Sequence, residues 1–176
     1  VDVQVQHPVD RDRIGIDKTE SYGFVRDFVG TVAQAGCEVF IVHARNAWLK
    51  GLSPKENREV PPLRYELVHQ LKREFPNLTM AINGGIGTTA DAEAQLRSVD
   101  GVMVGRQAYH DPWIMADWDR QLLGDQQPSA HTDRAAVEEA LVGYMEREAA
   151  AHATPWPHIA RHMLGLWNGT PGARKW

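Results

Sequence analysis

The fold of this chain is set by the segment Val39-Phe40-Ile41-Val42-His43. Its four consecutive apolar residues predict a strand covered on both faces, as in parallel sheets that are packed between helices. The strand ends in a histidine and opens into the loop 43–64, which carries five basic and two acidic side chains. Because ligand-binding groups lie on loops held by a rigid scaffold, this layout predicts a site for a polyanionic partner.

Strand-like and helical patterns alternate on either side of this segment. A polar strand at 9–16 precedes a helix that Thr19 can cap and that Gly36 ends. The further elements expected are helices at 65–75 and 88–96 and strands at 78–82 and 102–104. This order, with short turns and right-handed crossovers, predicts a parallel α/β sheet in either a barrel or a doubly wound arrangement.

The number of strands restricts these arrangements. A closed parallel barrel needs about eight strands, and only four are expected here. The sheet is therefore open, or the chain is the C-terminal half of a TIM (β/α)8 barrel, which the absence of an initiator Met favours. From about Pro128 the pattern is helical, at 132–151 and 157–167. We therefore expect a partial barrel at 1–125 and a small all-helical domain at 126–176.

Composition and charge restrict the function. The chain has 176 residues, a formal net charge of −4 and one cysteine, Cys37, which excludes an internal disulfide and fits a cytoplasmic protein. We expect no membrane and no metal partner, because the chain has neither a long apolar span nor histidines at metal-ligand spacing. Residues 111–148 carry nine acidic and three basic side chains, whereas 155–176 carry three basic and no acidic ones. Such local basic segments favour a polyanion despite the negative net charge.

Unusual residues follow three successive strands. They are His43, the run Asn83-Gly84-Gly85 and the pair Gly105-Arg106. Ligand sites of α/β proteins form at the C-terminal ends of strands, where glycines and helix N-termini let backbone N–H groups approach an anion. With helices expected from Thr88 and Gln107, these turns predict a phosphate site. Ordinary turn chemistry is the alternative for the glycine pair. Neither a Walker loop nor G-x-G-x-x-G is present, which favours a mononucleotide.

Five motifs resemble a known family. They are R-I-G-I-D at 13–17, A-G-C-E-V-F-I-V-H-A-R-N-A-W-L-K-G-L-S-P-K-E-N-R-E-V-P-P-L-R-Y at 35–65, I-N-G-G-I at 82–86, D-G-V-M-V-G-R-Q-A-Y-H at 100–110 and R-H-M-L-G-L-W-N-G-T-P-G-A-R-K-W at 161–176. Together they resemble the tRNA-dihydrouridine synthases of the DusA type, and the part from 49 to 58 is the most specific. The resemblance implies a TIM-barrel domain that binds FMN at its C-terminal mouth, followed by a helical tRNA-binding domain.

The resemblance also implies an activity and its residues. In the family NADPH reduces FMN, and the flavin reduces a uridine in the D-loop of tRNA, of the position 20/20a class, to 5,6-dihydrouridine. The FMN-binding residues implied are His43, Asn83, Gly84, Gly85, Gly105 and Arg106, with Arg11 near the place of a family lysine. The tRNA-binding residues implied are Lys55, Arg58 and Arg174, with Arg161 and Lys175 beside them. A monomeric, cytoplasmic full-length enzyme is expected.

The chain departs from the family pattern in its catalytic cysteine. That cysteine belongs to the half of the barrel that precedes this segment, and Cys37 matches the A-G-C at a strand entry instead. We therefore expect no catalytic residue on this chain and no activity of the chain alone. Two rival functions stay open, a non-catalytic RNA-binding remnant and another FMN-dependent barrel of the dihydroorotate-dehydrogenase kind. The remnant would bind tRNA without flavin, and the other enzyme would not need Lys55 and Arg58.

Overall fold

The chain folds as two compact units, Val1–Val104 and Gly105–Trp176. The computed structural model describes residues 9–14, 22–48, 50–124 and 133–173. The expected domain boundary at 125/126 lies within residues 125–132, outside the described residues, and it stays a prediction. The assignment of a catalytic and a tRNA-binding domain to these ranges stays a prediction.

A four-stranded sheet forms the centre of the first unit. Its strands are β1 (Val9–Arg13), β2 (Val39–His43), β3 (Thr79–Asn83) and β4 (Gly101–Met103). They lie in the order β1-β2-β3-β4, and all neighbours are parallel. A doubly wound sheet reverses its winding direction, so that its strand order is not the chain order. Here every crossover advances by one strand in one direction, which is consistent with part of a (β/α)8 barrel.

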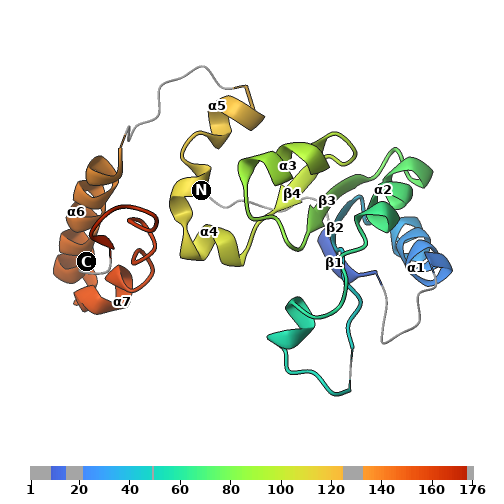
Figure 1. The fold of residues 1–176 in the computed structure, drawn as a ribbon, viewed down its shortest axis with the longest axis horizontal. Helices are drawn as coiled ribbons and strands as arrows, with labels where there is room; N and C mark the ends of the chain where they lie inside the picture. Colours follow the sequence, from blue (N-terminus) through green and yellow to red (C-terminus); the bar gives the residue numbers. More distant parts are fainter. Residues whose placement is uncertain (1–8, 15–21, 49, 125–132, 174–176) are drawn as a thin grey trace. The chain divides into compact units, whose positions relative to one another are not determined.

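Three helices connect these strands. They are α1 (Tyr22–Gln34), α2 (Tyr65–Glu74) and α3 (Thr89–Leu96). Right-handed crossovers in one direction place every helix on the same face of the sheet, and Figure 1 shows them along one side of the strands. The core lies between helices and sheet, and its fully buried side chains include Val25, Val29, Phe40, Val42, Val68, Leu71, Met80 and Ile82. Burial of these apolar groups is the main stabilisation of this unit.

The expectation that β2 is covered on both faces is wrong for the structure described. Phe40 and Val42 are fully buried, whereas Val39, Ile41 and His43 are only half-buried. The reason is the single helical layer, because alternate side chains of a strand point to opposite faces. On the other face the strands approach closely, since a Cβ added to Gly101 would lie 3.3 Å from the Cβ of Ala81.

Local signals in the sequence placed most element ends within a few residues. Gly36 has φ +98° and follows α1, as predicted for a left-handed helix end. Thr88 caps α3 and forms the predicted capping box with Asp91. Thr19, the expected cap of α1, lies outside the described residues, and the described helix begins at Tyr22. The helix expected from Gln107 begins one residue earlier, because α4 starts at Arg106.

The second unit is helical in its described parts. It contains α4 (Arg106–His110), the 3-10 turn η2 (Pro112–Met115), α5 (Trp118–Leu122), α6 (Arg134–His152) and α7 (Trp156–Ala160). The helix expected at 157–167 is therefore too long. After Ala160 the chain continues as a series of i→i+3 turns, such as the hydrogen bonds from the Met163 amide to the Ala160 carbonyl and from the Leu166 amide to the Met163 carbonyl.

Two side chains fasten this turn region to α6. The guanidinium of Arg134 lies 4.6 Å from the ring centroid of Trp113 and donates a 2.8 Å hydrogen bond to the Leu166 carbonyl. The indole N–H of Trp167 donates to Glu138 at 3.1 Å. Leu166 itself is buried. A helix that continued to residue 167 could not make these contacts. They therefore explain why α7 ends at Ala160 although the helical pattern of the sequence extends to residue 167. None of the helices in the described ranges is long and apolar enough to cross a bilayer.

Candidate functional site

The C-terminal ends of β2, β3 and β4 form one edge of the sheet. His43 is in register with Asn83, and Asn83 is in register with Met103. The Asn83 side-chain amide donates a 2.7 Å hydrogen bond to the Met103 carbonyl, and the Ala44 amide donates to the Asn83 carbonyl at 2.8 Å. Asn83 therefore ties the three strand ends together. The predicted neighbours His43 and Asn83 do meet at this edge.

The two glycines that follow β3 lie against the side chain of His43 and the end of the long loop. Gly84 has φ +113° and Gly85 has φ +71°, a region that favours glycine. A Cβ on Gly84 would lie 3.2 Å from Cε1 of His43, and a Cβ on Gly85 would collide with Leu63. The side chains of His43, Leu63 and Tyr65 thus pack directly against this turn, and only glycine fits at both positions without a shift of its neighbours.

Tyr65 was not singled out from the sequence, and it orients this glycine turn. Its hydroxyl donates a 2.8 Å hydrogen bond to the Gly84 carbonyl. Burial raises the pKa of the Tyr65 phenol, so that it is a neutral donor at physiological pH. Its position could have indicated this role, because Tyr65 is the first residue of α2 and directly follows the loop 43–64.

The N-terminus of α3 is engaged by the chain itself. The amides of Gly87 and Thr88 both donate to the carboxylate of Asp91, at 3.2 Å and 2.9 Å. Hydrogen bonds from Thr88 and from the Gly87 amide hold the pKa of Asp91 below its usual value. An acidic side chain of the protein itself thus already accepts from these two amides, and the expected contribution of this helix start to an anion site stays a prediction. The part of the site next to His43 is the glycine pair.

The basic loop is folded on itself. The side chain of Asn57 accepts a 2.7 Å hydrogen bond from the Trp48 amide and donates one of 2.7 Å to the Trp48 carbonyl. Arg45 is half-buried and donates to the carbonyls of Pro61 and Glu59. Arg45 therefore supports the loop from within and is not part of its cationic surface.

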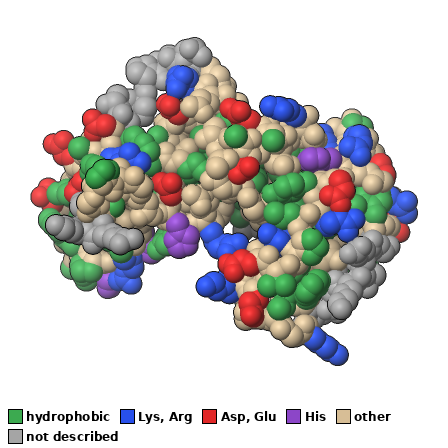
Figure 2. Space-filling model, viewed as in Figure 1, with side chains coloured by type: hydrophobic (Ala, Val, Ile, Leu, Met, Phe, Trp, Pro, Cys, Tyr) green, Lys and Arg blue, Asp and Glu red, His purple; other side chains and the backbone are tan. Residues whose placement is uncertain are grey.

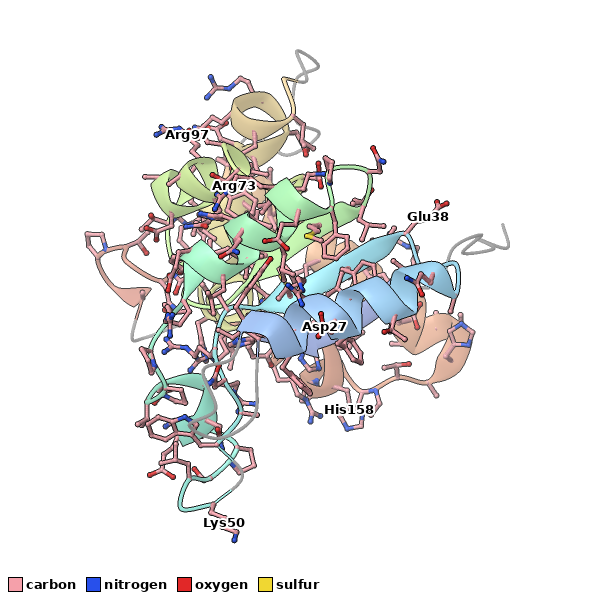
Figure 3. All side chains as sticks on the ribbon, turned by 90° about the vertical axis from the view of Figure 1, so that its right-hand side faces the viewer. Asp27, Glu38, Lys50, Arg73, Arg97 and His158 are labelled. Atoms are coloured by element: carbon pink, nitrogen blue, oxygen red, sulfur yellow. The ribbon has the colours of Figure 1, made fainter. Side chains whose placement is uncertain are left out.

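The predicted tRNA-binding residues of this loop lie on its surface. Both are exposed: Lys55 is the N-cap of the short 3-10 turn η1 (Glu56–Arg58), and Arg58 is its last residue. Figure 2 shows Lys and Arg side chains among acidic ones over the surface of the protein, and Figure 3 shows Lys50 projecting from the loop tip. Ser53 fastens Glu56, and its hydrogen bonds lower the pKa of that carboxyl. The loop thus presents three exposed cations, Lys50, Lys55 and Arg58, on an ordered backbone.

Gly105 and Arg106 belong to the second unit. Both are exposed, and Gly105 is the N-cap of α4 with φ −109°. A Cβ on Gly105 would meet nothing within 4 Å, so the described structure does not itself require glycine there. A joint phosphate site of Gly105 and Arg106 with the glycines after β3 stays a prediction.

The remaining predicted residues are placed in part. Arg11 lies in β1 with its backbone in register with Ile41, and its side chain is not described. Arg161 is exposed, and its Nε donates to the Pro157 carbonyl at 2.9 Å. Arg174 and Lys175 lie outside the described residues. No group of three or more potential metal ligands occurs among the side chains that the structure describes.

Sheet order and site together define a class. A parallel sheet that winds in one direction, with a glycine turn and a histidine at its carboxyl edge, is typical of a barrel-type α/β protein with its ligand site at that edge. A family model described as "Dihydrouridine synthase (Dus)" matches residues 1–176. The chain belongs to the dihydrouridine synthase family.

Curated relatives agree with this assignment. The chain is 56% identical over 165 residues to the tRNA-dihydrouridine(20/20a) synthase of Escherichia coli strain K12, which covers 93% of this chain and 47% of that protein. It is 56% identical to the Salmonella typhi enzyme of that name and 49% identical to the Vibrio cholerae one, again over 93% of this chain. The chain spans about half the length of these relatives. A solved response regulator of Salmonella typhimurium aligns with a TM-score of only 0.30 and 13% identity, too low to carry an argument.

Proposed function

We propose that this chain is part of an enzyme that reduces uridine to 5,6-dihydrouridine in the D-loop of tRNA, at the position 20/20a class, with NADPH and FMN. The observation that carries the proposal is one edge of the first unit. There the His43 and glycine turn lies beside an ordered loop with exposed Lys55 and Arg58. A compact anion site next to a cationic surface suits a phosphorylated cofactor and a polyanionic substrate.

The residues of this edge fit the phosphate side of FMN. Gly84 and Gly85 have positive φ and carry no side chain, and a Cβ added at either position would press against side chains that already pack on the turn, His43 and Leu63 at Gly84 and Leu63 and Tyr65 at Gly85. Backbone amides of such a turn can bind phosphate oxygens, and Gly105 with Arg106 would supply further donors. Bound FMN would supply hydride transfer. The chain itself would bind and orient the cofactor through His43, Asn83 and the glycines, with Arg11 as an additional cation.

The tRNA would be bound by side chains of the loop 43–64 and of the helical part of the chain. Lys55 and Arg58 would bind phosphates from the loop, and Arg161, Arg174 and Lys175 would do so from the helical part proposed for residues 126–176. Phosphate contacts of lysine and arginine position an RNA without reading its sequence. A tRNA substrate and a single reduced cysteine favour the cytoplasm as the compartment.

Cys37 is not proposed as the proton donor of the reaction. It is 4% exposed, and its thiol donates to the Val39 carbonyl at 3.4 Å. A catalytic cysteine needs thiol chemistry at a surface that the substrate can reach. We therefore assign no catalytic residue to this chain and expect no turnover from it alone.

Two measurements on the chain test the proposal. FMN titrated against the chain should lose fluorescence on binding, and Gly84→Ala should weaken that binding about tenfold or more, since the side chain enters the turn. Dihydrouridine formation on tRNA with NADPH should be absent from the chain alone. Turnover by the chain would overturn the assignment of the missing cysteine. Binding of tRNA without FMN would favour the RNA-binding remnant, and FMN binding that is insensitive to Gly84→Ala would remove the phosphate site.

A further inference from the structure

We propose that Tyr109 and His162 of the second unit form a stacking platform for an unpaired RNA base. This inference rests on the proposed function insofar as the natural RNA would be tRNA. Unpaired bases bind proteins by stacking on exposed aromatic rings, and such stacking depends little on the identity of the base.

The two rings are fastened to each other. The Tyr109 hydroxyl lies 3.0 Å from Nδ1 of His162, across 53 residues of sequence. Their ring centroids are 5.9 Å apart at an interplanar angle of 69°, and the ring of His110 lies 5.9 Å from Tyr109 at 77°. Edge-to-face packing of this kind fixes ring orientation. Tyr109 nevertheless remains 52% exposed, so about half of an oriented aromatic side chain faces solvent.

Close backbone packing holds the two segments under the rings. A Cβ on Gly165 would collide with the carbonyl group of His110, so the turn after α7 sits directly on the end of α4. The side-chain amide of Asn168 donates to the same His110 carbonyl. The rings are therefore ordered before any ligand binds, which reduces the entropic cost of binding.

The charge of the segment that carries His162 suits a nucleic acid. Residues 153–173 contain no Asp or Glu, and Arg161 and His158 are exposed next to His162 in sequence. Figure 2 shows histidine side chains at the surface of this unit, and Figure 3 shows His158 projecting outward from α7. The acid next to the platform in sequence is Asp111, which is half-buried. An oriented aromatic surface with an exposed arginine next to His162 in sequence fits a base and its phosphate, and it suits an acidic protein surface less well because stacking would go unused.

Fluorescence anisotropy with two RNA probes tests the platform. Labelled tRNA and labelled oligouridine are titrated with the wild-type chain and with variants. We expect Tyr109→Leu to weaken binding of both RNAs about tenfold, the loss of roughly one stacked base. Tyr109→Phe and Tyr109→Trp should keep most of the affinity because they keep the ring. The matched control is Tyr144→Leu, which removes a tyrosine of similar exposure, 44%, from α6 of the same unit and should change nothing.

Photo-crosslinking supplies a readout that a merely structural role would not change. Oligouridine containing 4-thiouridine should crosslink to the tryptic peptide 107–120, which contains Tyr109, and the crosslink should disappear in Tyr109→Leu. Unaltered RNA affinity in Tyr109→Leu, or an equal loss in Tyr144→Leu, overturns the platform. Lack of RNA binding by the wild-type chain overturns it as well, while FMN binding would still support the enzyme assignment. Oligouridine binding through Tyr109 without FMN binding would instead leave the platform standing and remove the flavoenzyme.

Discussion

Tyr65 shows at the residue scale how one hydroxyl can set the shape of a ligand loop. Its hydrogen bond to the Gly84 carbonyl fixes the peptide between Gly84 and Gly85, and the rotation of that peptide determines where the Gly85 amide points. Leu63 closes the same turn from the loop side. Neither side chain needs to touch a cofactor in order to determine whether the turn can bind one.

Tyr65→Phe should therefore reduce stability modestly and FMN binding more clearly. Loss of one half-buried hydrogen bond should lower the free energy of unfolding by about 1 kcal/mol. The freed peptide should also weaken FMN binding. Urea unfolding and a flavin titration measure the two effects separately. Tyr144→Phe, at an exposed position of α6, is the control and should leave both unchanged. An unchanged flavin affinity in Tyr65→Phe would contradict the positioning role.

Gly85→Ala tests whether glycine is needed at this position because of its positive φ, because of the contact with Leu63, or because of both. Positive φ alone should cost about 1 kcal/mol of unfolding free energy, and the collision with Leu63 should add about 1–3 kcal/mol. The control is Gly51→Ala, because Gly51 also has positive φ but an added Cβ meets nothing within 4 Å. Chemical denaturation of both variants separates the two costs. Equal losses would show that Leu63 moves aside.

At the scale of elements, Asp100 joins α2, β3 and β4. Its Oδ2 lies 2.8 Å from Nζ of Lys72 and accepts the Met80 amide at 2.7 Å. The Lys72 ammonium also donates to the Leu78 carbonyl at 2.8 Å. The Asp100 carboxylate thus connects the last turn of α2 with the beginning of β3, one residue before β4 starts. The sequence showed this position only as a turn before β4.

The pKa of Asp100 makes this junction sensitive to acid. Burial alone would raise that pKa, but the hydrogen bonds from Lys72 and Met80 outweigh burial and lower it from 3.8. A lowered pKa in the folded state stabilises the protein above the unfolded value, and this stabilisation is lost as the pH falls through the folded pKa. Unfolding free energies measured in urea should therefore fall as the pH drops below about 4. Asp100→Asn should flatten this decline, whereas Glu93→Gln at an exposed site of α3 should not.

The architecture of the first unit also belongs to this scale. The order of elements and the glycine turns could be predicted because apolar runs, Gly36 and the Thr88 cap are local signals. The engagement of Asp91 with the Gly87 and Thr88 amides could have been suspected from T-x-x-D, yet its consequence for an anion site needs the actual distances. The early end of α7 was not predictable from periodicity, because it results from contacts with α4 and α6.

At the scale of the whole molecule, binding of a polyanion by a chain of net charge −4 depends on where its cations lie. Lys55 and Arg58 are exposed on a loop that Asn57 holds in shape. Arg45 of the same loop is used internally. Counting basic residues along the loop therefore overestimated the cationic surface, and the structure reduces it to the residues that project outward.

The double variant Lys55→Ala with Arg58→Ala should change the salt dependence of tRNA binding. Each phosphate contact contributes about 0.7–0.9 to the slope of log affinity against log salt, so losing two should reduce its magnitude by roughly 1.5. The control is Arg73→Ala with Arg97→Ala, which removes the same charge from exposed positions on and after the outer helices. Anisotropy titrations at several salt concentrations measure both slopes. Equal changes in the two double variants would mean that only net charge matters.

Local patterns were sufficient to identify the parallel α/β class, the strand ends that carry His43 and the glycines, and the family resemblance. These features depend on neighbours in sequence, through apolar periodicity, turn chemistry and short motifs. Long-range packing alone settled the consecutive strand order, the one-sided burial of β2, the closure of the glycine turn by Leu63 and Tyr65, and the pairing of Tyr109 with His162. Each of these joins residues far apart along the chain, and their contacts arise only when the apolar faces of distant elements are buried together.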